Sequence, residues 1–365
     1  MLPVTFMLPT LPRNPSAGYT RFVKKPARKP ISRRTAVAKT PTLADIAAEV
    51  GVTKITVSRA LNAPDQLSPA TLEKVRAAIK RSGYTPNLLA GSLSSNRSKL
   101  VVALVPSIAG AMFTATMQNV AEHLQQHGYQ LLIGQAGYDD AREDALLEAV
   151  IGRRPDGIIL TGIVHSTQAR QKLRAARIPV VETWDLTPRP IDMLVGFSHP
   201  AIGEAAAAYL WGRGCRRPAI ISPDDRRARL RADAFMAFYA AKKHRVPVFE
   251  APAPTPMGDG RAGLAALLKA HPGIDGVFCG SDNLALGALI EAKARGLNVP
   301  QQLKVIGYGD QSFGKDADPP LTSLRIDGAA IGRLAAEMLV ARATGQTPKK
   351  KIVDIGFSIV ERASA

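Results

Sequence analysis

Apolar positions recur at helical spacing from residue 43 onward. Leu43, Ile46, Ala47 and Val50 are three or four residues apart, so they would share one face of a helix. Gly51 follows at the position where a left-handed C-terminal cap is needed, and we expect this glycine to end the helix.

A second and a third helix are predicted directly afterwards. Thr53 is a suitable N-cap for a helix over residues 54–61, and the pair Ser68–Pro69 predicts the start of a third helix that ends at Gly83. Two short helices joined by a glycine turn, with a third closing the core, are typical of a helix-turn-helix unit. The same pattern fits any small three-helix bundle with a basic exposed face.

The pattern changes after residue 100 to strands that alternate with helices. Such alternation predicts parallel sheets covered by helices, and about 265 residues are enough for two lobes of this kind. Ligands of open α/β sheets bind beyond the carboxyl ends of the strands, so a cleft between the lobes is the expected ligand site. The predicted strands cover residues 100–105, 129–133, 157–160, 179–181, 193–195, 218–221, 276–279 and 304–307.

Positive charge is concentrated in the first hundred residues. The chain carries 48 Lys and Arg against 30 Asp and Glu, a formal net charge of +18, and residues 1–40 hold nine of the basic residues and none of the acidic ones. A basic amino-terminal part before a nearly balanced remainder indicates a nucleic-acid-binding module joined to another domain. We interpret residues 1–40 as a disordered basic tail; a start codon assigned too far upstream would explain them equally well.

Other classes of protein fit the sequence poorly. The two cysteines build no disulfide framework, and no Cys/His group has zinc-ligand spacing. The longest charge-free run, residues 100–121, is interrupted by proline and glycine, and no export signal is recognisable. The G-x-G-x-x-G string at 258–263 follows a proline-rich stretch where a dinucleotide site needs a strand. We therefore expect a cytoplasmic protein that is not an enzyme, with no metal, no cofactor and no membrane partner.

The second predicted helix supplies candidate DNA contacts. In a helix-turn-helix unit this helix lies in the major groove with its first residues at the base edges. Lys54 could donate to guanine, Ile55 could pack on a thymine methyl group, and Thr56 lies beside them. The phosphates would be contacted by Thr53, Ser58 and Arg59.

The amino-terminal motifs resemble those of a known family. The strings that carry the resemblance are Thr42–Ala47, Gly51–Thr53, Thr56–Arg59 and Gly83–Asn87. They are similar to the head of the LacI-type repressors, and the similarity continues over nearly all of residues 42–365. It implies a helix-turn-helix head and a two-lobed, periplasmic-binding-protein-like α/β core with parallel sheets. One departure is Ala44, where many relatives carry a tyrosine near the DNA backbone.

The segment after Pro86 resembles the hinge helix of that family. Asn87 could cap a helix of one or two turns, and the resemblance implies that Leu93 is wedged into the minor groove of the operator. Such a short helix is marginal in isolation, so the residues alone fit an ordinary flexible linker as well.

Residues after the predicted strands are candidate effector contacts. Those identified from strand ends are Ser107, Phe113, Thr161, His165, Glu182, Trp184, Asp185, Arg229, Arg231, Ser281 and Asp282. The resemblance implies that Arg231 and Asp282 among them bind the effector. Gly309 stands where many sugar-binding relatives have an aspartate. Loss of that carboxylate removes repulsion toward an acidic ligand, with which Arg231, and Arg229 as a second candidate, could form an ion pair. Residues 180–185, 192–197 and 354–357 also resemble gluconate-utilisation repressors, which suggests a sugar acid.

These observations predict a transcriptional repressor of carbohydrate or sugar-acid genes. Its parts would be a tail (1–40), a helix-turn-helix domain (42–86), a hinge and linker (87–99) and an effector-binding and dimerisation domain (100–365). The expected partners are double-stranded operator DNA, a small effector and a second copy of the chain, with a tetramer as a further option. A solute-binding transport or sensor protein for a sugar acid is the alternative.

Overall fold

The computed structural model describes residues 41–85, 97–108, 111–137, 140–163 and 165–365. The predicted tail and the hinge residues Asn87 and Leu93 lie outside the described residues. Contacts between residues divide the chain into two units, Met1–Pro86 and Asn87–Ala365.

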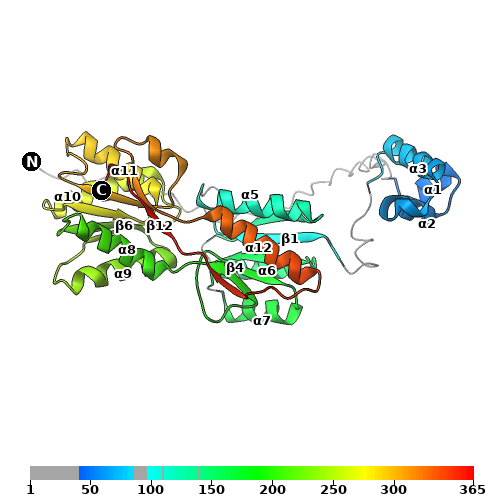
Figure 1. Ribbon diagram of the computed structural model, residues 1–365, viewed down its shortest axis with the longest axis horizontal. Coiled ribbons are helices and arrows are strands. Elements are labelled where there is room, and N and C mark those ends of the chain that lie inside the picture. Colours follow the sequence, from blue (N-terminus) through cyan, green and yellow to red (C-terminus); the bar gives the residue numbers. More distant parts are fainter. Residues whose placement is uncertain (1–40, 86–96, 109–110, 138–139, 164) are drawn as a thin grey trace, which may run out of the picture. The chain divides into compact units, whose positions relative to one another are not determined.

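The first unit, here called the head, folds as the predicted helices. Its elements are α1 (Leu43–Val50), α2 (Lys54–Asn62), the 3-10 turn η1 (Pro64–Gln66) and α3 (Pro69–Ser82) (Figure 1). Thr42 caps α1 and exchanges hydrogen bonds with Asp45 in a capping box. Gly51, at a φ of 74°, ends α1 in the left-handed conformation that favours glycine. The buried core consists of Ile46, Ala47, Val57, Ala60, Val75 and Ala78.

The second unit, the core, contains two six-stranded sheets. The sheet of the first lobe has the order β11-β5-β4-β3-β1-β2, and all its strands are parallel. The strands are β1 (Leu100–Val105), β2 (Gln130–Gln135), β3 (Gly157–Thr161), β4 (Val180–Thr183), β5 (Met193–Gly196) and β11 (Ile352–Asp354). The helices of this lobe are α5 (Ala111–Gln126), α6 (Asp140–Ile151), α7 (Thr167–Ala176) and α12 (Gly328–Ala343).

The second lobe repeats this architecture in the order β12-β10-β9-β8-β6-β7. Its strands are β6 (Pro218–Pro223), β7 (Val248–Ala251), β8 (Gly276–Cys279), β9 (Lys304–Tyr308), β10 (Thr322–Arg325) and β12 (Ser358–Val360). Its helices are α8 (His199–Gly212), α9 (Arg226–Ala240), α10 (Met257–Ala270), α11 (Asp282–Ala294) and the short turn η2 (Ser312–Asp316). The two-lobed α/β prediction is confirmed, except that β12 pairs with β10 in the antiparallel direction.

The chain passes between the lobes at three places, near residues 197–198, 326–327 and 355–357. Each passage joins the carboxyl end of a strand in one sheet to an element of the other lobe (Figure 1). One apolar cluster extends through both lobes and includes Phe197, Phe235 and Phe278. Among the described helices, none is both long enough and apolar enough to cross a lipid bilayer.

Close packing of α8 on α9 fixes the backbone that carries a candidate site residue. A Cβ atom added at Gly203 in α8 would lie 2.0 Å from the carbonyl oxygen of Arg231 in α9. Only glycine allows the two helix backbones to approach this closely. The sequence therefore sets the position of Arg231 partly through a residue 28 positions earlier in the chain.

We predict that Gly203→Ala destabilises the core by about 2 kcal/mol or more, because the new methyl group overlaps a backbone atom that cannot move alone. Gly212→Ala, at the end of the same helix, is the matched control, since a Cβ there meets nothing within 4 Å. Urea unfolding followed by circular dichroism measures both. Equal stabilities of the two variants would contradict the packing argument.

Candidate functional site

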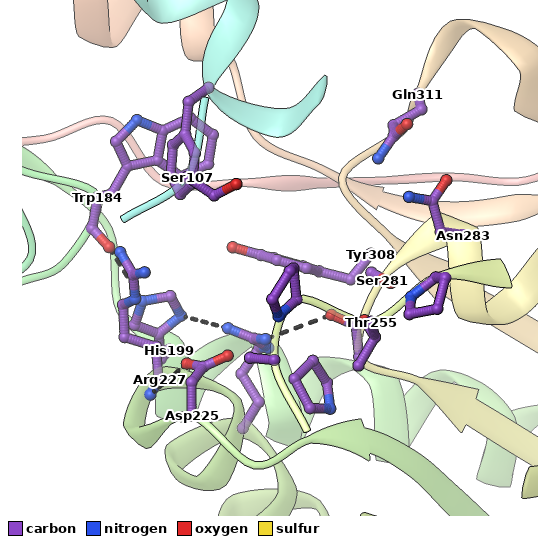
Figure 2. Close-up of a pocket in the computed structure, with 17 residues that line it drawn as sticks. Ser107, Trp184, His199, Asp225, Arg227, Thr255, Ser281, Asn283, Tyr308 and Gln311 are labelled. Carbon is purple, nitrogen blue, oxygen red and sulfur yellow. Dashed lines mark hydrogen bonds between the residues drawn. The ribbon is translucent and has the colours of Figure 1, made fainter. Parts of the chain in front are cut away.

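A cavity of about 460 Å³ opens beyond the carboxyl ends of strands from both sheets. The first lobe contributes Ser107, Phe113 and Trp184, which follow β1 and β4. In Figure 2, Trp184 and His199 lie across the cavity from Asn283 and Gln311. The second lobe contributes His199, Pro223, Asp225, Arg227, Arg231, Ala253, Pro254, Thr255, Pro256, Gly280, Ser281, Asn283, Tyr308 and Gln311.

Arg231 is the most buried cation of the cavity, with 4% of its surface exposed. Its guanidinium carbon lies 4.1 Å from the centre of the Tyr308 ring, and one Nη donates to the carbonyl oxygen of Gly280 at 3.4 Å. Its Nε has no hydrogen-bond partner among the described residues, and no described carboxylate forms an ion pair with it. A buried cation without a counter-ion is costly, so this group is available for an anionic ligand.

His199 forms a hydrogen bond with the guanidinium group of Arg231. Its Nε2 lies 3.0 Å from the carbonyl oxygen of Trp184, and its Nδ1 lies 3.0 Å from an Nη of Arg231 (Figure 2). Burial lowers the pKa of His199 well below its ordinary value, and the charge of Arg231 lowers it further. The ring is therefore neutral, with Nε2 donating to Trp184 and Nδ1 accepting from Arg231.

A second cation, Arg227, lies one helical turn before Arg231 on α9 and lines the same cavity. Its guanidinium carbon is 5.8 Å from the centre of the Phe113 ring, so it reaches a side chain of the other lobe. Asp225 also lines the cavity, but its carboxylate accepts from the backbone N–H groups of residues 227 and 228 as the N-cap of α9. The positive charge of the two arginines is thus only partly offset.

Of the residues proposed from the sequence, Ser107, Phe113, Trp184, Arg231 and Ser281 line this cavity. Thr161 lies instead at a small separate hollow of the first lobe, together with Glu143. Arg229 is two residues from Arg227 and therefore points away from the cavity, where its Nε lies 3.9 Å from Glu250.

Glu182 faces the interior of the first lobe and not the cavity. It is fully buried on β4 and accepts from the N–H of Ile191 at 2.5 Å. Its carboxylate lies 3.6 Å from both His165 and Arg170. Burial alone would lower the pKa of His165, but hydrogen bonds to Glu143 and Glu182 raise it to about 9, so this charged cluster holds the loop after β3 in place.

The two remaining aspartates also make internal contacts. Asp282, fully buried at the start of α11, accepts from the N–H of Gln311 and the hydroxyl of Ser323, both at 2.6 Å. It therefore positions the Gln311 loop without lining the cavity, and burial raises its pKa to about 6. Asp185 accepts from the N–H of Leu186, and burial raises its pKa although nearby arginine charges oppose the shift.

The structure adds residues that the sequence argument missed. Arg227 could have been found, because residues four apart share a helix face. His199, Tyr308, Asn283 and Gln311 carry no comparable local signal. The described part of the chain contains no group of three His, Cys, Asp or Glu side chains arranged so that they could hold a metal ion.

The proposed DNA-contacting residues lie on the amino-terminal half of α2 and the residue before it. Thr53 caps α2, and its hydroxyl is 2.9 Å from that of Thr56. Lys54 and Arg59 are exposed, and Ile55 has 64% of its surface exposed, although it is a large apolar residue. Ser58 is half-buried beside the side chain of Asn62. An exposed isoleucine among cationic and hydroxyl side chains suits a base-contacting surface.

Two family models match the chain. Residues 42–87 match the bacterial regulatory proteins of the lacI family, and residues 207–365 match a periplasmic binding protein-like domain. The first of these models covers the head.

Relatives extend the match to almost the whole chain. The HTH-type transcriptional regulator GntR of Pseudomonas aeruginosa is 36% identical over 91% of this chain and 98% of its own length. The regulator of the same name from Escherichia coli strain K12 is 32% identical over 88% of this chain and 97% of its own. A crystal structure of a LacI-family transcriptional regulator from Silicibacter pomeroyi superposes with a TM-score of 0.84 at 29% identity, covering 89% of this chain and 99% of that one. The chain therefore belongs to the LacI family of bacterial regulatory proteins and is a DNA-binding transcriptional regulator, not an enzyme.

Proposed function

We propose that this regulator represses genes of carbohydrate or sugar-acid catabolism and that its affinity for operator DNA is controlled by an anionic polyhydroxy compound bound between the lobes. A sugar acid such as gluconate is the ligand class that fits best. The regulator acts on DNA in the cytoplasm as a homodimer, in line with its family, whose members bind operator DNA and small effectors as dimers.

The buried Arg231 carries this proposal. A carboxylate entering the cavity would supply the missing counter-ion and accept from the unpartnered Nε. The nearby protein carboxylates are already engaged. Asp282 is bound to Gln311 and Ser323, and Asp310 pairs with Arg325 at 2.6 Å and Arg362 at 2.7 Å. The cavity lining carries two arginines against one carboxylate, that of Asp225, which caps α9, so one positive charge is in excess.

The remaining lining suits a chain of hydroxyl groups. Side chains of Ser281, Asn283 and Gln311 and the phenol of Tyr308 offer both donors and acceptors. Phe113 and Trp184, whose ring centres are 5.1 Å apart and edge-on, form an apolar wall. A volume of about 460 Å³ lies in the range of small-molecule sites and accommodates a six-carbon acid.

We predict that Arg231→Gln weakens gluconate binding by about 30-fold or more, because removing one partner of a buried charge pair costs several kcal/mol. Arg229→Gln is the matched control on the same helix, since its side chain is 58% exposed and faces away. Isothermal titration calorimetry with gluconate measures both variants. Tighter binding of a neutral sugar than of any sugar acid by the wild-type protein would contradict an acidic effector.

We predict that Lys54→Ala changes which bases the protein prefers, because its ammonium group lies at the start of the recognition helix. Lys74→Ala, an exposed position on α3, removes the same charge and is expected to leave base preference unchanged. Selection of bound sequences from a random duplex library measures both. Identical preferences of Lys54→Ala and wild type would exclude base contact by Lys54, and failure of the wild type to enrich any sequence would contradict operator recognition.

A further inference from the structure

The strands of the first lobe all begin at one edge of their sheet, because the sheet is entirely parallel. We call this the amino edge: residues 97–99, 152–156, 177–179, 190–192 and 344–351, which precede β1, β3, β4, β5 and β11, together with Arg342 at the end of α12. Figure 1 shows α12 running from the passages between the lobes to this end of the first lobe, away from the second lobe. The effector cavity lies at the opposite, carboxyl ends of the strands.

Positive charge gathers at the amino edge. It contains nine Lys or Arg residues against two acidic ones, Asp156 and Asp192. The described core, residues 97–365, carries 33 Lys and Arg and 26 Asp and Glu in its sequence, so this edge accounts for its whole positive excess. The basic residues are Arg97, Lys99, Arg153, Arg154, Arg177, Arg342, Lys349, Lys350 and Lys351.

A groove of about 710 Å³ crosses the amino edge between four guanidinium groups, those of Arg97, Arg154, Arg177 and Arg342. Asp156 also lines it, but its carboxylate accepts from the backbone N–H groups of residues 98 and 99 and from the hydroxyl of Ser98, at 2.8–3.1 Å. That carboxylate therefore fixes the start of β1 and offsets the arginine charges only in part.

The arginines of this groove differ in their ion pairs. Arg342 lies 3.6 Å from Asp192, whereas Arg154 and Arg177 are exposed and form no ion pair within the described residues. Like charges held together at a surface repel one another, and a polyanion would relieve this repulsion.

The extent of the charge favours a polymer over a small anion. The basic residues span β1 to β11, which are separated by four strand spacings of about 4.8 Å, or roughly 20 Å in all. The run Lys349–Lys351 lies before β11 and outside the lining of the groove. A phosphate backbone offers regularly spaced charges over such a distance, about one per 1.7 Å of duplex axis.

The covalent connection sets an upper limit on the distance between this edge and the head. Eleven residues separate Thr85 of the head from Arg97 of the amino edge, and a chain of that length spans at most about 40 Å in any conformation. A duplex held by α2 is therefore within reach of the edge at which the core begins. We propose that the amino edge of the first lobe binds phosphates of the same duplex that the head recognises, adding affinity that does not depend on base sequence.

The double variant Arg154→Gln/Arg177→Gln of the full chain tests this inference. Binding to a 40-base-pair duplex is measured by fluorescence anisotropy between 50 and 300 mM KCl. Each lost phosphate contact lowers the magnitude of the slope of log affinity against log salt by about 0.9. Two contacts are lost from each protomer of the homodimer, so the expected fall is about 4, with affinity reduced about tenfold or more at 0.1 M salt. Lys349→Gln/Lys350→Gln/Lys351→Gln is expected to change the slope in the same direction.

The matched control is Arg245→Gln/Lys269→Gln, which removes two exposed charges from the second lobe. Unchanged melting temperature and gluconate affinity of all variants show that the fold is intact. A salt slope of Arg154→Gln/Arg177→Gln equal to that of the control would overturn the inference while leaving the proposed function standing. A second result would also overturn it. If inorganic pyrophosphate raised the melting temperature of the wild type but not of Arg154→Gln/Arg177→Gln, and the salt dependence of DNA affinity were the same for both, the groove would be a site for a small anion. Absence of any DNA binding by the wild-type chain would overturn both.

Discussion

The hydrogen bond between the neutral His199 ring and the buried guanidinium of Arg231 is the interaction on which the geometry of the candidate site depends. A buried cation is normally matched by a carboxylate, which would stabilise it and at the same time occupy it. A neutral imidazole orients the guanidinium without neutralising it. The charge therefore remains available to the cavity, and the protein tolerates its burial because Tyr308 and Gly280 provide further, weaker contacts.

This interaction is placed where the lobes meet. His199 is the first residue of α8, directly after one of the three passages between the lobes, and it also binds the carbonyl oxygen of Trp184 from the first lobe. Arg227 lies beside Phe113 of that lobe as well. A ligand that binds the arginines and touches the aromatic wall contacts both lobes, so its binding energy depends on how they are arranged. The same residues thus line the candidate site and join the two halves of the core.

Local signals in the sequence predicted local structure well. The caps Thr53 and Ser68 and the glycine at 51 place the head helices almost to the residue, because capping chemistry is encoded within a few positions. The strands that were not predicted, β7, β10, β11 and β12, each include an exposed residue, whereas the comparably short strands β4, β5 and β8, which were predicted, are buried throughout. The G-x-G-x-x-G string lies inside α10, where Gly260 allows close packing on α11.

The candidate site was predicted only in part, because much of it is created by tertiary packing. Strand ends pointed to the region where the cavity lies, but β4 is buried on both faces, so position alone could not show that Glu182 points away from the cavity. His199 and Arg231 are 32 residues apart and meet only because α8 packs closely on α9.

The three passages between the lobes also affect folding during translation, because they separate paired strands of the first sheet in the sequence. Five strands of the first sheet are complete at residue 196, yet the edge strand that covers β5 ends at residue 354. At translation rates of about 5–20 residues per second, β11 is synthesised roughly 10–30 s after β5, so β5 lacks its pairing partner during that time. During synthesis its unpaired backbone is open to association with other nascent chains, a hazard that a lobe encoded by one uninterrupted stretch would avoid.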